Sequence, residues 1–140
     1  MVKPSSRFEM NSNIDLVIFG ARGDLAERKL LPALYQLDRA GLLDESMRIA
    51  GLARQDVTTE EFIGNTHENL NKYVSESDWD EQCWARFSSR LTYVKVDFSK
   101  QEEYQNLKLW LNESRTQIYY MATPPSIFGS ICENLNGAGC

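Results

Sequence analysis

Residues 16–30 read LVIFGARGDLAERKL. An apolar, β-branched run ends at Phe19, a glycine turn spans Gly20 to Gly23, and an amphipathic helix pattern begins directly after it. Strand, glycine turn and helix in this order present backbone N–H groups to a phosphate in doubly wound α/β sheets. Gly20 can take a positive φ at the strand exit, and Gly23 lets the helix start lie close to the strand and to a ligand. The spacing is G-x-x-G and not the full G-x-G-x-x-G, so its place between strand and helix carries the interpretation.

Apolar segments alternate with helical patterns along the rest of the chain. We expect strands at about residues 15–19, 47–53, 91–97 and 117–122. We expect helices at about residues 23–39 and 59–74, after Ser77, after Ser99 and from Ser126. This alternation builds βαβ units and a parallel sheet. The sequence therefore predicts an α/β fold, a Rossmann-like doubly wound parallel sheet with strand order 3-2-1-4.

The helical patterns also predict faces, kinks and caps. In the first helix the apolar positions share one face that should pack on the sheet: Ala26, Leu30, Ala33, Leu34 and Leu37. Asp38 lies off that face, and Pro32 should kink the helix because it lacks a backbone donor. Capping boxes are expected at residues 58–61 and 99–102, and the fourth strand is apolar enough for a central position.

Three of these segments should converge on one crevice. Ligands of doubly wound sheets bind outside the carboxyl ends of the strands, at the switch point between the first and fourth strands. Those ends carry Gly20, Arg54 and Ala122 with Pro124. NADP sites place an arginine at the end of the second strand, where NAD sites usually place an acid. Arg54 therefore favours binding of a 2′-phosphate, with an ordinary surface arginine as the alternative.

Length and composition favour one acidic domain without nucleic-acid or membrane partners. The chain has 140 residues and a formal net charge of −5, which suits one compact domain at residues 14–140 but is short for a complete oxidoreductase. Residues 1–13 are polar and should form a disordered tail. No apolar run approaches the roughly 20 residues that cross a bilayer. Three cysteines without a C-x-x-C pair favour a reducing, cytoplasmic setting, and no metal site or Ser/His/Asp set is visible.

Several segments resemble one known family. Residues 20–34 contain GARGDLA followed by KLLPAL, residues 51–54 read GLAR, and residues 122–128 read ATPPSIF. These segments are similar to the coenzyme fingerprint G-A-S-G-D-L-A, the G-x-A-R segment and the A-x-P-P-[ST] segment of glucose-6-phosphate dehydrogenases. Arg22 stands where that family usually has a serine. The resemblance covers nearly the whole chain from Ile14 onward.

The resemblance implies NADP as coenzyme and a role in oxidising glucose 6-phosphate to 6-phosphogluconolactone, the first step of the pentose phosphate pathway. The expected coenzyme contacts lie in the glycine turn, the first helix and the two other strand exits. They are Gly20, Ala21, Arg22, Gly23, Asp24, Leu25, Lys29, Arg54, Ala122, Pro124 and Pro125.

Some of these residues have a second interpretation. Asp24 competes with an anion at the helix start, so it serves equally well as a helix cap. Arg22 either offsets that charge and contacts the pyrophosphate or is solvated. Lys29 either approaches the phosphates, as the family implies, or is solvated. Pro124 and Pro125 either stiffen the coenzyme site or simply form a loop.

The family's catalytic segments, R-I-D-H-Y-L-G-K-E and E-K-P-F-G, do not occur in this chain, and its second, α+β substrate domain is absent. We therefore expect no catalytic residues here, and coenzyme binding without turnover. Glucose 6-phosphate is expected as a partner of a full-length protein only, for which a homo-oligomer also remains open. A stand-alone regulatory module or a remnant without ligand are the alternatives. The single histidine, His67, is expected to be solvated.

Overall fold

Four parallel strands form one sheet in a computed structural model that describes residues 13–140. The strands are β1 (Ile14–Phe19), β2 (Arg48–Ala53), β3 (Leu91–Lys95) and β4 (Thr116–Met121), in the order β3-β2-β1-β4. The predicted fold class and strand order are therefore confirmed. The predicted disordered tail lies outside the described residues, except for Asn13.

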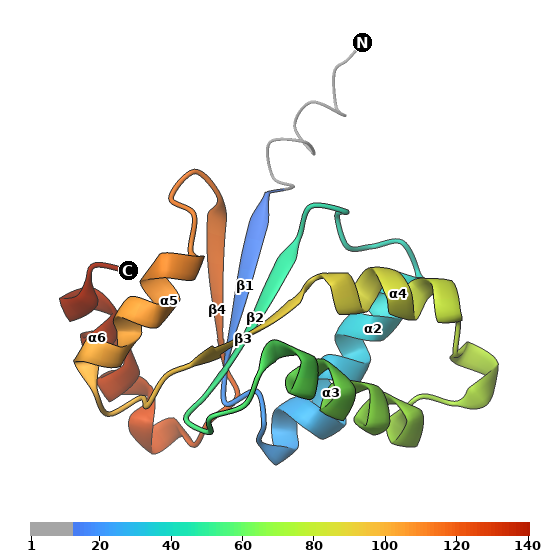
Figure 1. Cartoon of the computed structure of the whole chain (residues 1–140), viewed down its shortest axis with the longest axis horizontal. Coiled ribbons are helices and arrows are strands. Elements are labelled where there is room, and N and C mark those ends of the chain that lie inside the picture. The colour runs from blue at the N-terminus through green and yellow to red at the C-terminus, as the bar shows by residue number, and fades with distance from the viewer. Residues whose placement is uncertain (1–12) are drawn as a thin grey trace, which may run out of the picture.

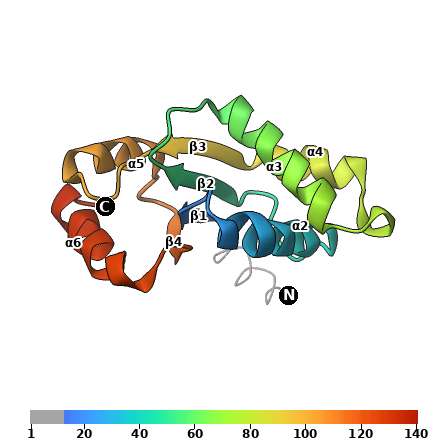
Figure 2. The same cartoon turned by 90° about the horizontal axis from the view of Figure 1, so that it is seen from below.

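Helices cover both faces of the sheet, as expected of a doubly wound fold. One layer contains α2 (Leu31–Arg39), α3 (Thr59–Tyr73) and α4 (Glu81–Ser89), and the other contains α5 (Tyr104–Trp110) and α6 (Phe128–Ala138). Short helical turns join them: η1 (Ala26–Leu30), η2 (Glu76–Asp78), η3 (Gln101–Glu103) and η4 (Pro125–Ile127). Figure 2, seen from below, shows α2, α3 and α4 on one side of the strands and α5 and α6 on the other. None of the described helices is long and apolar enough to span a membrane.

Two hydrophobic cores follow from the alternation of side chains along the strands. In β1, Leu16 and Ile18 pack in the core beneath α2, α3 and α4, whereas Val17 and Phe19 pack beneath α5 and α6. All four side chains are buried because helices cover both faces of the sheet at β1. β1 therefore contributes side chains to both cores.

The first helix departs from the expected α-helical pattern through a π turn. The Leu31 N–H donates to the carbonyl of Ala26, five residues earlier, and Pro32 follows directly. A widened turn accommodates a proline whose ring would otherwise press on the preceding turn, so the expected kink takes this form. The extra residue shifts by one position which later residues of the helix face the sheet.

This shift overturns part of the predicted buried face, although Ala26 and Leu34 are buried as predicted and Leu30 packs against the core. The buried residues after the π turn are Leu31, Pro32, Leu34, Tyr35 and Asp38. The predicted core residues Ala33 and Leu37 are exposed instead, and Asp38, predicted to lie off the buried face, is completely buried. The prediction was wrong because a constant period of 3.6 residues cannot represent one inserted residue.

One predicted capping box is confirmed and the other is wrong. Thr58 and Glu61 exchange side-chain and backbone hydrogen bonds at the start of α3. At the second site no side chain caps η3 or α5, because the Asp97 carboxylate takes the Ser99 N–H at 3.0 Å and the Ser99 hydroxyl at 2.7 Å. Glu103 then accepts the Asp97 N–H at 2.9 Å.

The apolar strand β4 lies at an edge of the described sheet and not in a central position. It pairs only with β1 among the described strands, and its Ile118 and Tyr120 side chains are 44% and 40% exposed. An apolar composition predicts a strand with both faces covered, but it does not identify the strand's neighbours.

Two completely buried aspartates hold the framework through arginines. Asp38 accepts hydrogen bonds from Arg86 at 2.9 Å and from Arg90 at 3.0 Å, which joins α2 to α4 and to the start of β3. Asp15 pairs with Arg48 and Arg115, which joins the amino ends of β1, β2 and β4. Burial alone pushes the pKa of Asp15 upward, but the hydrogen bonds from both arginines outweigh it and leave that pKa below its ordinary value.

We predict that Asp38→Ala lowers the free energy of unfolding by about 3–5 kcal/mol, because the substitution leaves the buried Arg90 guanidinium without its carboxylate. Asp24→Ala is the matched control. Asp24 forms an exposed pair with Arg28 at 3.3 Å, so its loss should cost less than about 0.5 kcal/mol. Urea unfolding monitored by circular dichroism measures both. Similar losses in the two variants would contradict the structural role assigned to Asp38.

Candidate functional site

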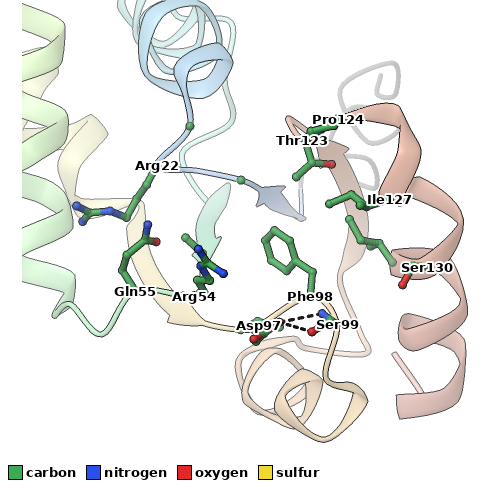
Figure 3. Close-up of a pocket in the computed structure, with 15 residues that line it drawn as sticks. Arg22, Arg54, Gln55, Asp97, Phe98, Ser99, Thr123, Pro124, Ile127 and Ser130 are labelled. Carbon is green, nitrogen blue, oxygen red and sulfur yellow. Dashed lines mark hydrogen bonds between the residues drawn. The ribbon is translucent and has the colours of Figure 1, made fainter.

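A cavity of about 640 Å³ opens at the carboxyl ends of the four strands. Figure 3 shows its walls: Arg22, Arg54 and Gln55 lie toward α3, and Thr123, Pro124 and Ile127 lie toward α6. Each strand exit contributes to the lining, together with the start of α6. The lining residues are Gly20, Arg22, Gly23, Ala53, Arg54, Gln55, Val96, Asp97, Phe98, Ser99, Thr123, Pro124, Ile127, Ser130 and Ile131.

Gly20 lets two strand exits meet at the floor of this cavity. Its φ is +87°, and a Cβ built on it would lie 2.7 Å from the carbonyl oxygen of Ala122 and 2.9 Å from Cγ2 of Thr123. The Ala122 N–H donates to the carbonyl of Phe19 at 2.8 Å, which ties the two exits together. A glycine is therefore required both for its backbone conformation and for the close approach.

Several backbone N–H groups of the glycine turn already donate hydrogen bonds within the protein. The N–H groups of Gly20 and Ala21 both donate to the carbonyl of Leu52 at 3.0 Å, and the Gly23 N–H donates to the carbonyl of Gly20. Donors for an anion therefore come from the following helix start, where first-turn N–H groups have no acceptor within the helix. Asp24 and Leu25 occupy that start.

Two arginines bring positive charge to the side of the cavity near α3. Arg54 is exposed at the exit of β2. Arg22 is half-buried and extends toward α3, and its Nη1 atom is buried without a hydrogen-bond partner among the described residues. An arginine nitrogen in this condition is available for an anionic ligand or for a rearrangement toward one.

Only some of the predicted site residues line the cavity. Gly20, Arg22, Gly23, Arg54 and Pro124 do so. The remaining residues lie behind or outside the lining. Ala21 and Ala122 are buried, whereas Asp24, Leu25, Lys29 and Pro125 are exposed.

Sequence reasoning missed the contribution of β3. Val96, Asp97, Phe98 and Ser99 follow this strand and line the cavity. The predicted order 3-2-1-4 already places the carboxyl end of β3 beside that of β2, so the rule applied to the other strands would have found these residues. Gln55 and Thr123, next to predicted residues, were also missed.

Asp97 is the acidic residue of this lining. Hydrogen bonds from the Ser99 hydroxyl and N–H lower the pKa of its carboxyl, and the charges of Lys100 and Arg54 add to the effect. Asp97 is therefore ionised at neutral pH.

His67 does not belong to the cavity lining. Its ring lies 5.4 Å from the ring of Trp79 and 4.8 Å from that of Trp84, between centroids. The side chain is half-buried in this aromatic cluster, so His67 is less solvated than expected. The helical pattern placed His67 beside polar neighbours in sequence and could not show which helix packs against it.

Comparison with known proteins relates the chain to one enzyme family. The model of the family "Glucose-6-phosphate dehydrogenase, NAD binding domain" matches residues 17–140. The glucose-6-phosphate 1-dehydrogenase of Dickeya dadantii is 43% identical over 126 residues, which cover 89% of this chain and 26% of that protein. The enzyme of Gluconobacter oxydans is 38% identical over 92% of this chain and 27% of its own length.

Solved structures give the same relationship. The crystal structure of glucose-6-phosphate 1-dehydrogenase from Mycobacterium avium superposes with a TM-score of 0.83 and 31% identity, over 91% of this chain and 27% of that one. A glucose-6-phosphate dehydrogenase in complex with its substrate gives a TM-score of 0.81 at 28% identity, over 93% of this chain and 28% of that one. The chain thus spans about a quarter of the length of these relatives.

We predict that Gly20→Ala destabilises the fold by about 2–5 kcal/mol, the sum of a left-handed backbone penalty and an overpacked contact with the carbonyl of Ala122. Gly41→Ala is the matched control, since Gly41 has a φ of +75° but nothing within 4 Å of its added Cβ. The control should lose only the backbone penalty of about 1–2 kcal/mol. Equal losses in chemical unfolding would show that the approach of the β1 and β4 exits does not require a glycine.

Proposed function

Because the chain belongs to the glucose-6-phosphate dehydrogenase family, as its NAD-binding domain, we propose that it is the coenzyme-binding part of a glucose-6-phosphate 1-dehydrogenase and that its crevice binds NADP. The observation that carries the choice of coenzyme is Arg54, which stands at the exit of β2 in the cavity lining. Bound NADP would accept a hydride from the sugar. The residues of this chain bind and orient the coenzyme.

The second strand supports NADP over NAD. Residues 51–55 read GLARQ and contain no acid that could hold the 2′-hydroxyl of a ribose. Arg54 is exposed and has no ion pair among the described residues, so its guanidinium can form a charge-assisted contact with a 2′-phosphate. The acid of the lining, Asp97, lies at the exit of β3 and is held by Ser99.

The first strand supplies the pyrophosphate site in this proposal. The helix start at Asp24 and Leu25 directs first-turn N–H groups and the positive end of the helix dipole toward the crevice. Gly23 keeps the space beside this start free, since a Cβ there would lie 3.3 Å from the carbonyl oxygen of Gly20. Arg22 supplies a further charge with an uncommitted Nη1 atom. In this arrangement the Asp24 carboxylate is best placed facing solvent, paired with Arg28.

We also assign the protein to the cytoplasm in this proposal. The structure leaves Cys83, Cys132 and Cys140 as free thiols, which persist in a reducing compartment. The family's reaction takes place on small soluble phosphates, and nothing in the acidic composition favours a nucleic-acid partner.

We predict that the chain binds NADP about 10–150-fold more tightly than NAD, because a charge-assisted contact to the 2′-phosphate contributes about 1.5–3 kcal/mol. Arg54→Ala should remove most of this difference and leave the affinity for NAD nearly unchanged. Arg28→Ala removes an exposed arginine of η1 that does not line the cavity and should leave the ratio as it is. Isothermal titration of both coenzymes measures the ratios. Equal affinities in the unmutated chain would refute the assignment of Arg54.

We further predict that the chain alone binds NADP without oxidising glucose 6-phosphate. Proton abstraction needs a base beside the reacting carbon, and a positioned general base contributes roughly 10²–10⁴-fold. The one histidine packs against Trp79 and Trp84 and is not part of the cavity lining. NADP at ~100 times its Kd should stabilise the fold by about 2.7 kcal/mol, visible as a thermal shift.

The matching activity assay mixes the purified chain with NADP and glucose 6-phosphate and follows NADPH absorbance. Turnover that follows the chain through purification would show that a catalytic base is present after all. A thermal shift with NADP but no turnover supports a coenzyme-binding part, and no shift with either coenzyme favours a remnant without ligand.

A further inference from the structure

We propose that a second pocket, between η1 and α3, binds a small zwitterion of the α-amino-acid type. The carboxylate of the ligand would pair with Arg22 and its ammonium group with Glu27. This pocket is a different cavity from the crevice at the strand exits, so the inference does not depend on the proposed binding of NADP.

The second pocket has a volume of about 250 Å³ and lies where α3 packs beside η1. Pockets for drug-sized ligands measure roughly 300–1,000 Å³, so this one suits a smaller molecule. The side chains that line it are all polar or charged, and those from α3 recur at i, i+3, i+4 and i+7 on one helix face. The lining residues are Arg22, Glu27, Asn65, Glu68, Asn69 and Lys72.

Two positive and two negative side chains of this lining form no ion pair within the described residues 13–140. Arg22 and Glu27 are half-buried, whereas Glu68 and Lys72 are exposed. The Nη1 atom of Arg22 is buried without a hydrogen-bond partner, and Figure 3 shows this side chain turned from the crevice toward α3. Because unpaired charges lose hydration on burial, a ligand of the opposite charge recovers free energy there.

The presence of both signs of charge selects the kind of ligand. A simple anion would suit Arg22 but would lie in the same small pocket as the Glu27 carboxylate, and a simple cation would meet the reverse conflict. A small zwitterion satisfies both side chains, because a guanidinium donates to a carboxylate and a carboxylate accepts from an ammonium group.

Two half-buried amides, Asn65 and Asn69, complete the pocket. Each amide offers both a donor and an acceptor, which a carboxamide side chain on the ligand would complement. Glutamine carries a carboxylate, an ammonium group and a carboxamide, and it is therefore the probe for this pocket.

The test titrates the 140-residue chain, without coenzyme, with L-glutamine and with two analogues that each lack one charged group. Glutaramate lacks the amino group, and 4-aminobutanamide lacks the carboxylate. Glutamine should bind about tenfold or more tightly than either analogue, because each analogue leaves one charge-assisted contact unmade. Chemical-shift changes of the backbone amides measure the three dissociation constants, and the changes should concentrate in η1 and α3.

Two variants assign the contacts. Glu27→Gln should weaken glutamine about tenfold without weakening glutaramate, which has no ammonium group to lose a partner. Arg22→Gln should weaken glutamine by a similar factor without weakening 4-aminobutanamide, which has no carboxylate. The matched control is Glu60→Gln, which makes the same change of charge on α3 outside the pocket lining and should alter none of the three constants.

Equal affinities for glutamine and its two analogues would overturn the inference, and so would the absence of chemical-shift changes in η1 and α3. A Glu27→Gln or Arg22→Gln variant that weakens all three ligands by the same factor would also overturn it, because the loss would not follow the charged group removed. None of these titrations contains NADP, so their outcome leaves the proposed coenzyme site to its own tests.

Discussion

The close approach of the β1 and β4 exits at Gly20 is the constraint on which the crevice depends. No Cβ fits between this residue and the carbonyl of Ala122, so the two exits can lie in contact only if the residue is glycine. From this point the chain after β1 passes to the helical layer of α2, and the chain after β4 passes to the layer of α6. Because the two segments diverge from a shared floor, a cavity opens between them at the switch point.

The amino ends of the strands, on the side of the sheet opposite the cavity, are held together by ion pairs. Asp15 is completely buried and binds Arg48 and Arg115, so the amino ends of β1, β2 and β4 are joined through a single carboxylate. Arg48 also lies 4.2 Å from the centre of the Trp110 ring, which adds α5 to this network. The amino ends of these strands are thus joined on the side away from the cavity. The arginines at the carboxyl edge, Arg22 and Arg54, have no such partner among the described residues, and they are the ones that the proposed function assigns to phosphates.

Sequence patterns predicted the strands, the helices and one capping box. They were wrong where a π turn or a competing hydrogen bond changed the local structure. The Thr58 capping box was predicted because cap chemistry is encoded over a few residues. The strand order was predicted because alternating strands and helices favour the doubly wound topology. The buried face of the first helix was wrong because a π turn before Pro32 shifts the register by one residue without changing the composition. The predicted capping box after β3 was wrong because the Ser99 hydroxyl donates its hydrogen bond to the Asp97 carboxylate instead. That same competition orients a cavity residue that pattern reasoning had not considered.

Under the proposed function two strand exits bind different parts of the coenzyme. The helix start after β1 would face the pyrophosphate, and Arg54 after β2, which lines the cavity, would face the 2′-phosphate. All of these contacts bind or orient, and the one imidazole of the chain is held in an aromatic cluster elsewhere. The chain spans about a quarter of the length of the related enzymes, and the proposed function assigns it the binding of coenzyme only. Contacts placed at separate strand exits would let the affinity for coenzyme be changed at one exit while the contacts at the other remain.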